Sequence, residues 1–196
     1  MKKGRLFIFS GPSGVGKSTI LHEIFAANPN LYFSVSATTR DPRPGETDGK
    51  DYHFTDVDHF RKLIEEDELL EYAEFVGNYY GTPREYVDAE LAKGRDVILD
   101  IEINGAIQVR TKRPDAVSIY IAPPSWDDLE NRLVGRGTDS ETKVRERLAR
   151  AREEFSIAHT YDYFVINRSL ETAVNEVKAI MLAEHCRPDE RMDLLK

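Results

Sequence analysis

The sequence contains little that could cross-link it or place it in a membrane. Its single cysteine, Cys186, cannot form an intramolecular disulfide bond, which fits a reducing compartment. The apolar run near the N-terminus covers only residues 6–9, which is too short for a signal peptide or a membrane-spanning helix. The five histidines show no spacing typical of metal ligands. We therefore expect a cytoplasmic protein without a membrane segment.

A net basic charge is also missing. The chain has 27 lysines and arginines against 35 acidic residues, which gives a formal net charge of −8 at pH 7. This argues against non-specific binding to nucleic acid or to an acidic membrane surface, because both need a basic stripe. It does not exclude a nucleotide, since a phosphate site needs only a few local cations. The 196 residues, 40% of them hydrophobic, suffice for one domain with a proper core.

Apolar runs alternate with helical patterns along most of the chain. Short apolar runs predict buried strands at residues 5–10, 96–101, 117–121 and 164–166. Apolar residues at helical spacing predict helices at residues 17–27, 106–113, 126–134, 141–158 and 170–185. This alternation indicates an α/β fold with a parallel sheet and helices on both of its faces.

Two segments interrupt the alternation. The first, residues 34–90, begins with a stretch rich in proline and glycine that forbids a long helix. It continues with predicted helices at 58–66, capped by Asp56 or Asp58, and at 83–93, and with strands at 69–76 and 79–80. We interpret it as an inserted α+β subdomain and the charged helical residues 125–157 as a lid. The core of this single domain would then comprise residues 1–33, 91–124 and 158–196.

Residues 11–18, GPSGVGKS, match the phosphate-loop pattern G-x-x-x-x-G-K-[ST] between a predicted strand and a predicted helix. The glycines let backbone N–H groups curl around a phosphate, and the helix dipole adds positive potential. Lys17 would reach the β- and γ-phosphates of a bound nucleotide, and the Ser18 hydroxyl would bind Mg²⁺. GTPases, transport ATPases and small-molecule kinases share this loop, so it predicts a triphosphate site without specifying the reaction. The predicted ATP contacts within it are Gly11, Pro12, Ser13, Gly14, Val15, Gly16, Lys17, Ser18 and Thr19.

A second group of cations lies in the proline-rich stretch of the inserted subdomain. Arg40 and Arg43 stand three residues apart, and Tyr52 follows. Two guanidinium groups and a phenol suit a second, smaller phosphate. In the alternative, this segment is a solvated loop whose arginines pair with Asp41 and Glu46. These residues alone leave both interpretations open.

Six motifs, spread in order over nearly the whole chain, carry a family resemblance. They are FSVSATTRDPRPGETDGKDYHF at 33–54, GNYYGT at 77–82, LDIEINGA at 99–106, IAPPS at 121–125, GRGTD at 135–139 and VIN at 165–167. Together they resemble guanylate kinases, phosphate-loop enzymes that transfer the γ-phosphoryl group of ATP to GMP. The resemblance implies a GMP-binding subdomain at 34–90, a lid at 125–157, ATP and GMP or dGMP as substrates, and Mg²⁺ as cofactor. The chain departs from many relatives at Glu102, where we expect Asp, and at Asn104, where we expect Gln.

The resemblance also implies a role for each matching residue. Guanine would be read by Ser36, Glu71 and Thr82. The GMP phosphate would be held by Arg40, Arg43, Tyr52 and Tyr80, with Glu102 and Arg147 also at the acceptor. Besides the phosphate loop, the residues near ATP would be Arg132, Arg136 and Asn167. The metal site would comprise Ser18 and Asp100, and the catalytic residues would be Lys17, Arg40, Asp100, Arg136 and Arg147.

The chemistry of two carboxylates agrees with these roles. The single carboxylate of Glu71 can accept hydrogen bonds from both the N1–H and the N2–H₂ of guanine, a pair of donors that adenine lacks. Asp100 ends a predicted strand, and ligands of parallel sheets gather at the carboxyl ends of the strands. We expect Trp126 to pack within its helix rather than to stack on a base. Two alternatives remain: a guanylate-kinase-like protein-binding module without phosphotransfer, against which the intact phosphate loop argues, and a kinase for another small phosphate acceptor.

Overall fold

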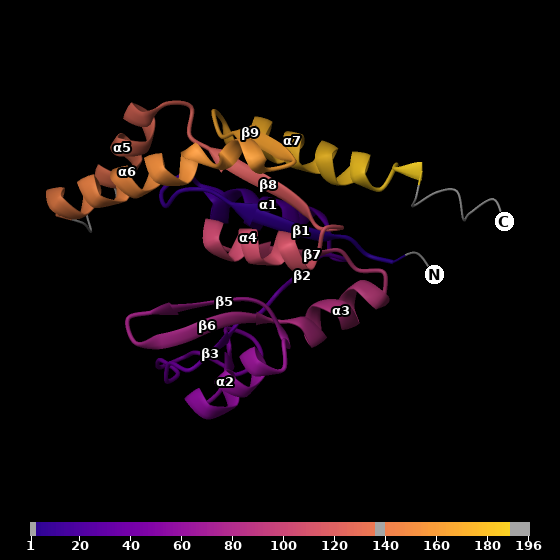
Figure 1. Cartoon of the computed structure of the whole chain (residues 1–196). Coiled ribbons are helices and arrows are strands. Elements are labelled where there is room, and N and C mark those ends of the chain that lie inside the picture. Colours follow the sequence, from indigo (N-terminus) through magenta and orange to yellow (C-terminus); the bar gives the residue numbers. More distant parts are fainter. Residues whose placement is uncertain (1–2, 136–139, 189–196) are drawn as a thin grey trace. The chain divides into compact units, whose positions relative to one another are not determined.

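The computed structural model describes residues 3–135 and 140–188 (Figure 1). The chain divides into two compact units, the first with residues 3–8 and 30–117 and the second with residues 9–29 and those from 118 onward. Strand β1, Leu6–Ser10, belongs partly to each unit. Within the described ranges, no helix is both long and apolar enough to cross a membrane.

The strands of the parallel sheet are short and largely buried. Five strands of the described chain have the order β2–β7–β1–β8–β9. The four besides β1 are β2 (Tyr32–Phe33), β7 (Val97–Asp100), β8 (Val117–Ala122) and β9 (Tyr163–Ile166). Parallel pairing joins β2 to β7 and β8 to β9. All residues of β1 and β8 are buried, as expected for strands covered on both faces. The predicted parallel sheet is therefore confirmed, with β2 as an additional strand.

The first unit also contains a smaller sheet. Its strands, in the part of the unit that the structure describes, have the order β4–β3–β6–β5. These strands are β3 (Ala37–Thr38), β4 (His53–Phe54), β5 (Leu69–Phe75) and β6 (Asn78–Pro83). Strands β5 and β6 are antiparallel, and Glu71 lies opposite Thr82. Strand β6 extends beyond the predicted residues 79–80 because pairing with β5 continues as far as Pro83.

Three helices of the described first unit accompany these strands. Helix α2, Val57–Glu65, begins at Asp56, whose side chain accepts a 2.7 Å hydrogen bond from the His59 backbone N–H, a cap that commonly contributes about 1 kcal/mol. Phe60 on α2 is fully buried against the smaller sheet. The others are α3, Arg84–Ala92, and α4, Ile103–Lys112. Helix α4 starts three residues before the predicted position, so its first turn includes a glycine.

The second unit is mainly helical. It contains α1, Lys17–Ala27, α5, Trp126–Val134, α6, Glu141–Ser156, the 3₁₀ turn η1, Ala158–Thr160, and α7, Leu170–Glu184. Serine side chains cap α5, α6 and α7 by accepting a backbone N–H of the first turn. Helices α5 and α6 pack around a small apolar cluster, and Trp126 packs against it with its ring 5.4 Å from that of Phe155. Trp126 therefore lies in helix packing, as predicted.

Candidate functional site

The phosphate loop follows β1 directly and ends in α1. Gly16 is the N-cap of α1 and has φ 94°, a backbone conformation that side chains with a Cβ rarely adopt. No side chain caps this helix, in contrast to α5, α6 and α7. Backbone N–H groups at the start of α1, together with the helix dipole, can therefore serve a bound phosphate.

The polar side chains predicted for the donor lie at both ends of this loop. Lys17 is half-buried at the start of α1, and Ser18 and Thr19 beside it are exposed. The exposed Ser13 hydroxyl accepts a 3.3 Å hydrogen bond from Nη1 of Arg147 on α6. The structure thus brings Arg147 to the phosphate loop.

Arg136, the other lid arginine predicted to be catalytic, lies outside the residues that the structure describes. Its predicted role stays a prediction.

Arg132 and Asn167, both predicted to lie near ATP, meet at the backbone of the phosphate loop. Nη1 of Arg132 and Nδ2 of Asn167 donate to the same Val15 carbonyl oxygen, at 2.9 and 2.8 Å. Nη2 of Arg132 donates to the backbone oxygen of Asn167 at 2.9 Å. The donor groups of both side chains are therefore directed at the protein backbone.

In the first unit, a pocket of about 250 Å³ opens beside the end of β7. It brings together four residues predicted from the sequence for the acceptor and the metal: Ser36, Tyr52, Thr82 and Asp100. Asp100 is the last residue of β7 and is half-buried. The volume approaches the range typical of small-molecule sites, roughly 300–1,000 Å³. The pocket is thus a candidate acceptor site.

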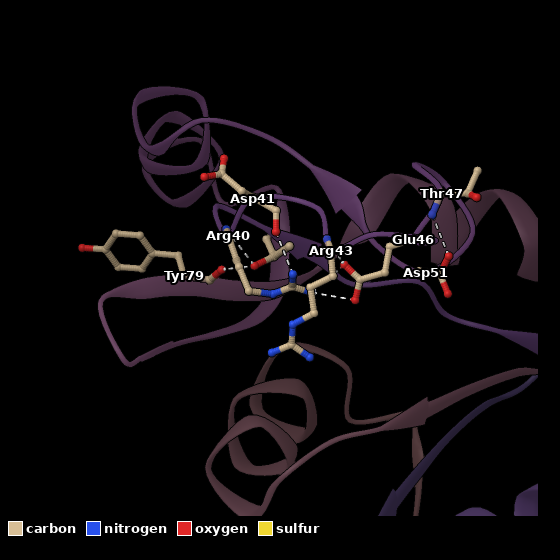
Figure 2. Close-up of polar contacts among 8 residues, drawn as sticks. Arg40, Asp41, Arg43, Glu46, Thr47, Asp51 and Tyr79 are labelled. Atoms are coloured by element: carbon tan, nitrogen blue, oxygen red, sulfur yellow. Dashed lines mark hydrogen bonds and ion pairs between the residues drawn. The ribbon is translucent and has the colours of Figure 1, made fainter.

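The loop that follows β3 carries the predicted phosphate-binding arginines (Figure 2). Nη2 of Arg40 donates to both carboxylate oxygens of Glu46, at 2.9 and 3.0 Å, and Nη1 donates to the Asp41 backbone oxygen at 2.7 Å. The Arg43 backbone N–H donates to Glu46 at 2.8 Å, while its exposed guanidinium points away from Glu46 in Figure 2. The Arg43 amide and the Arg40 guanidinium hold the pKa of Glu46 below its usual range. Part of the ion pairing foreseen in the solvated-loop alternative is thus present.

Two tyrosines lie beside Arg40. The rings of Tyr52 and Tyr80 meet edge to face with their centroids 6.1 Å apart. The Arg40 guanidinium carbon lies 5.4 Å from the centroid of the Tyr52 ring, within range of a cation–π interaction. Three of the four residues predicted to hold the acceptor phosphate, Arg40, Tyr52 and Tyr80, therefore lie together.

Glu71 is a buried carboxylate with 8% of its surface exposed. The Thr82 hydroxyl on the neighbouring strand donates to its Oε1 at 2.6 Å. Burial raises the pKa of Glu71, and the nearby Glu102 carboxylate raises it further, against the lowering effect of the Thr82 hydroxyl. Carboxylates are seldom buried without strong partners, so this side chain is suited to a ligand that offers hydrogen-bond donors.

The first turn of α4 forms one wall around Glu71. A Cβ added at Gly105 would lie 2.8 Å from Oε2 of Glu71, so only glycine leaves the carboxylate where it is. Glu102, the N-cap of α4, is exposed and makes no capping hydrogen bond with its side chain. Sequence reasoning did not identify Gly105 as a functional residue. The glycine within the LDIEINGA motif at residues 99–106 was the signal that could have found it.

Comparison with known proteins agrees with this geometry. The guanylate kinase family model matches residues 3–184. A guanylate kinase of Lactococcus lactis is 51% identical over 188 residues, 96% of this chain and 92% of the relative. One from Streptococcus thermophilus is 52% identical over 187 residues, 95% of this chain and 90% of the relative. The crystal structure of a guanylate kinase from Anaplasma phagocytophilum superposes with a TM-score of 0.73 and 33% identity, over 96% of this chain and 90% of that one. This chain belongs to the guanylate kinase family.

Proposed function

We propose that this chain transfers the γ-phosphoryl group of ATP to GMP or dGMP, giving ADP and the nucleoside diphosphate. The observation that carries the proposal is the buried Glu71 carboxylate, paired with Thr82, which itself lines the acceptor pocket. The N1–H and N2–H₂ groups of guanine would give this carboxylate two donors. The Ser36 hydroxyl, on the wall of the same pocket, would donate to O6 of the base.

The acceptor phosphate would be held by Arg40, Arg43, Tyr52 and Tyr80. Arg40 already lies beside Tyr52, and the exposed guanidinium of Arg43 extends from the same loop. The attacking atom is an oxygen of the GMP phosphate. This oxygen is mostly deprotonated at neutral pH, because the second pKa of a phosphate monoester is about 6. No residue therefore needs to act as a general base.

The donor phosphates would be bound by the backbone N–H groups of the phosphate loop and by Lys17. Arg147, which reaches the loop at Ser13, and Arg136 would neutralise charge on the phosphoryl group as it moves. Such a reaction needs two phosphates held in line and little covalent chemistry from the protein. The residues assigned to the donor hold the phosphates of ATP in this arrangement, and the acceptor residues hold the phosphate of GMP.

Guanylate kinases are kinases that use ATP, and we propose that Mg²⁺ accompanies the ATP here. Mg²⁺ usually takes one or two oxygen ligands from a protein and the remainder from substrate phosphates and water. The exposed Ser18 hydroxyl and the half-buried Asp100 carboxylate are oxygen donors of this kind. When bound, the ion neutralises part of the charge on the β- and γ-phosphates. We place the reaction in the cytoplasm, a compartment that the single cysteine suits.

The test is a coupled assay of ADP formation with GMP, dGMP, AMP, UMP, CMP and inosine monophosphate as acceptors. We expect GMP and dGMP to react well, inosine monophosphate to be intermediate because it lacks the N2 amine, and AMP to react at least ~10⁴-fold less efficiently than GMP. Glu71→Ala should lower kcat/KM for GMP by at least ~100-fold and leave the KM for ATP unchanged, since charge-assisted hydrogen bonds contribute roughly 1.5–3 kcal/mol each.

Glu74→Ala is the matched control, because Glu74 lies on the same strand but is exposed. It should behave as the wild type. A wild type that uses AMP as readily as GMP would contradict both the role of Glu71 and the proposed reaction. A wild type that forms no ADP with any acceptor would favour the protein-binding alternative.

A further inference from the structure

The Val15 carbonyl, inside the phosphate loop, accepts hydrogen bonds from two side chains that are distant in sequence. Arg132 comes from α5 and Asn167 from the residue after β9, and their donor atoms lie 2.9 and 2.8 Å from the oxygen. The second guanidinium nitrogen of Arg132 binds the Asn167 backbone oxygen, which ties the two donors together. The Asn167 backbone N–H donates to Ala122 at the end of β8 at 2.8 Å, so the donor itself is fixed.

These two bonds determine how the peptide between Val15 and Gly16 is oriented. In a trans peptide the C=O and the N–H point in opposite directions, and the described chain contains no cis peptide bond. Holding the Val15 oxygen on Arg132 and Asn167 therefore directs the Gly16 N–H away from both side chains. This N–H belongs to the N-cap of α1, where backbone amides receive an anion. A carbonyl turned toward the anion would instead oppose binding.

Steric contacts behind the loop support the same orientation. A Cβ at Gly16 would lie 2.6 Å from Nδ2 of Asn167, so the amide packs directly against the glycine. A Cβ at Gly14 would lie 2.8 Å from Cδ2 of Leu133. Helix α5 thus contributes a hydrogen-bond donor at Arg132 and an apolar contact at Leu133. Two independent contacts from one helix hold the loop.

We propose that Arg132 and Asn167 are positioning residues, which keep the phosphate loop in its phosphate-binding conformation through the Val15 carbonyl. The inference rests on the proposed phosphotransfer function. It differs from the roles that the family resemblance implies, in which both side chains serve ATP directly. Because both side chains act through the loop, losing either one lowers the affinity for every ligand that the loop binds by its phosphates, whatever base that ligand carries.

Two substitutions that conserve charge test this. Asn167→Leu keeps approximately the same shape but removes the donor. Arg132→Lys keeps the positive charge, but an ammonium cannot span two carbonyl oxygens as the guanidinium fork does. The matched controls are Asn131→Leu and Arg145→Lys, at exposed positions of α5 and α6. Circular dichroism sets a temperature at which every variant is folded.

Affinity is measured for ATP and for inorganic tripolyphosphate, each without GMP so that no phosphoryl transfer takes place. Both test variants should bind both ligands about tenfold more weakly, the loss expected for one charge-assisted hydrogen bond. The two factors should agree within about twofold, and the KM for GMP should stay unchanged. Inosine triphosphate used as a donor in place of ATP should lose kcat/KM by the same factor. The controls should match the wild type.

Three results would overturn the proposal. An Asn167→Leu variant that loses ATP but retains tripolyphosphate would make Asn167 a contact to the base. An Arg132→Lys variant with wild-type affinity, beside an Arg132→Ala variant that loses it, would make Arg132 a point charge on a phosphate. Wild-type affinities in both test variants would leave the loop independent of them. Failure of the proposed function would look different, because the wild type itself would then form no ADP from ATP and GMP.

Discussion

The close approach of Gly105 to Glu71 allows the proposed base recognition to be perturbed without substituting Glu71 itself. In Gly105→Ala, the new Cβ would begin 2.8 Å from Oε2 of Glu71 and 3.3 Å from its Cδ. Ordinary van der Waals contact starts at 3.4 Å, so the carboxylate must move by about 0.6 Å from the helix. The Glu71 side chain, rather than the backbone of α4, has the freedom to move.

In the proposed site, a displacement of this size would misalign the carboxylate with the donor edge of guanine. The loss of about half to one charge-assisted hydrogen bond corresponds to roughly 1–2 kcal/mol, or about a 5- to 30-fold decrease in kcat/KM for GMP. The KM for ATP should not change, since the donor residues belong to other segments of the chain. Steady-state kinetics with each substrate varied in turn measures both effects.

The stability of the variant gives an independent readout. Alanine favours a helix over glycine by up to about 1 kcal/mol, which offsets part of the cost of the steric contact with Glu71. The free energy of unfolding of Gly105→Ala should therefore not fall by more than about 1 kcal/mol. Thr111→Ala is the control, because it raises helix propensity at an exposed position of the same helix. Thr111 lies in the last turn of α4, whereas Gly105 lies in the first turn, beside Glu71. Wild-type kcat/KM for GMP in Gly105→Ala, or an equal loss for both substrates, would refute this reasoning.

Three further predictions concern single groups of the site. Lys17→Met should reduce turnover to a few per cent or less at saturating ATP while leaving the circular dichroism spectrum unchanged; a variant that stays active would remove Lys17 from the donor site. Asp100→Asn should lower kcat much more than it weakens GMP binding, and equal effects would indicate a structural role. Since burial raises the pKa of Glu71, GMP affinity should rise as pH increases through that raised pKa. The stability that protonated Glu71 contributes, full below its ordinary pKa, should be lost over the same window in calorimetry.

The strands and helices of the larger sheet could be predicted because their patterns are local. Apolar runs such as those of β1 and β8 are buried on both faces, and the serine and aspartate caps mark helix starts. Strand β2 could not be predicted in this way. It has two residues, and only its pairing with β7 makes it a strand. The start of α4 was missed because Gly105 is an unfavourable helix residue whose place is explained by Glu71.

The candidate site likewise has parts that local sequence patterns predict and parts that depend on contacts between distant residues. The phosphate loop is contiguous in sequence, so a triphosphate site could be predicted there from spacing. In the arginine loop, spacing alone left phosphate binding and a solvated loop both open. The bond from Arg132 to Val15 spans 117 residues, and that from Asn167 spans 152. No local pattern encodes a contact at such a separation. The family resemblance assigned both residues to the ATP side, and their bonds to Val15 support the positioning role proposed above.

The pairing of Arg40 with Glu46 affects how the acceptor site responds to its ionic surroundings. Glu46 is an internal counter-ion, tethered to the same loop by the Arg43 amide and unable to diffuse away. At the proposed site, a phosphate that binds Arg40 would therefore replace Glu46 as its partner instead of neutralising a bare cation. Few mobile ions leave with each binding event, and fewer released ions give a shallower dependence of affinity on salt. The proposed site would thus discriminate against stray inorganic anions and still accept a phosphate whose base is also recognised.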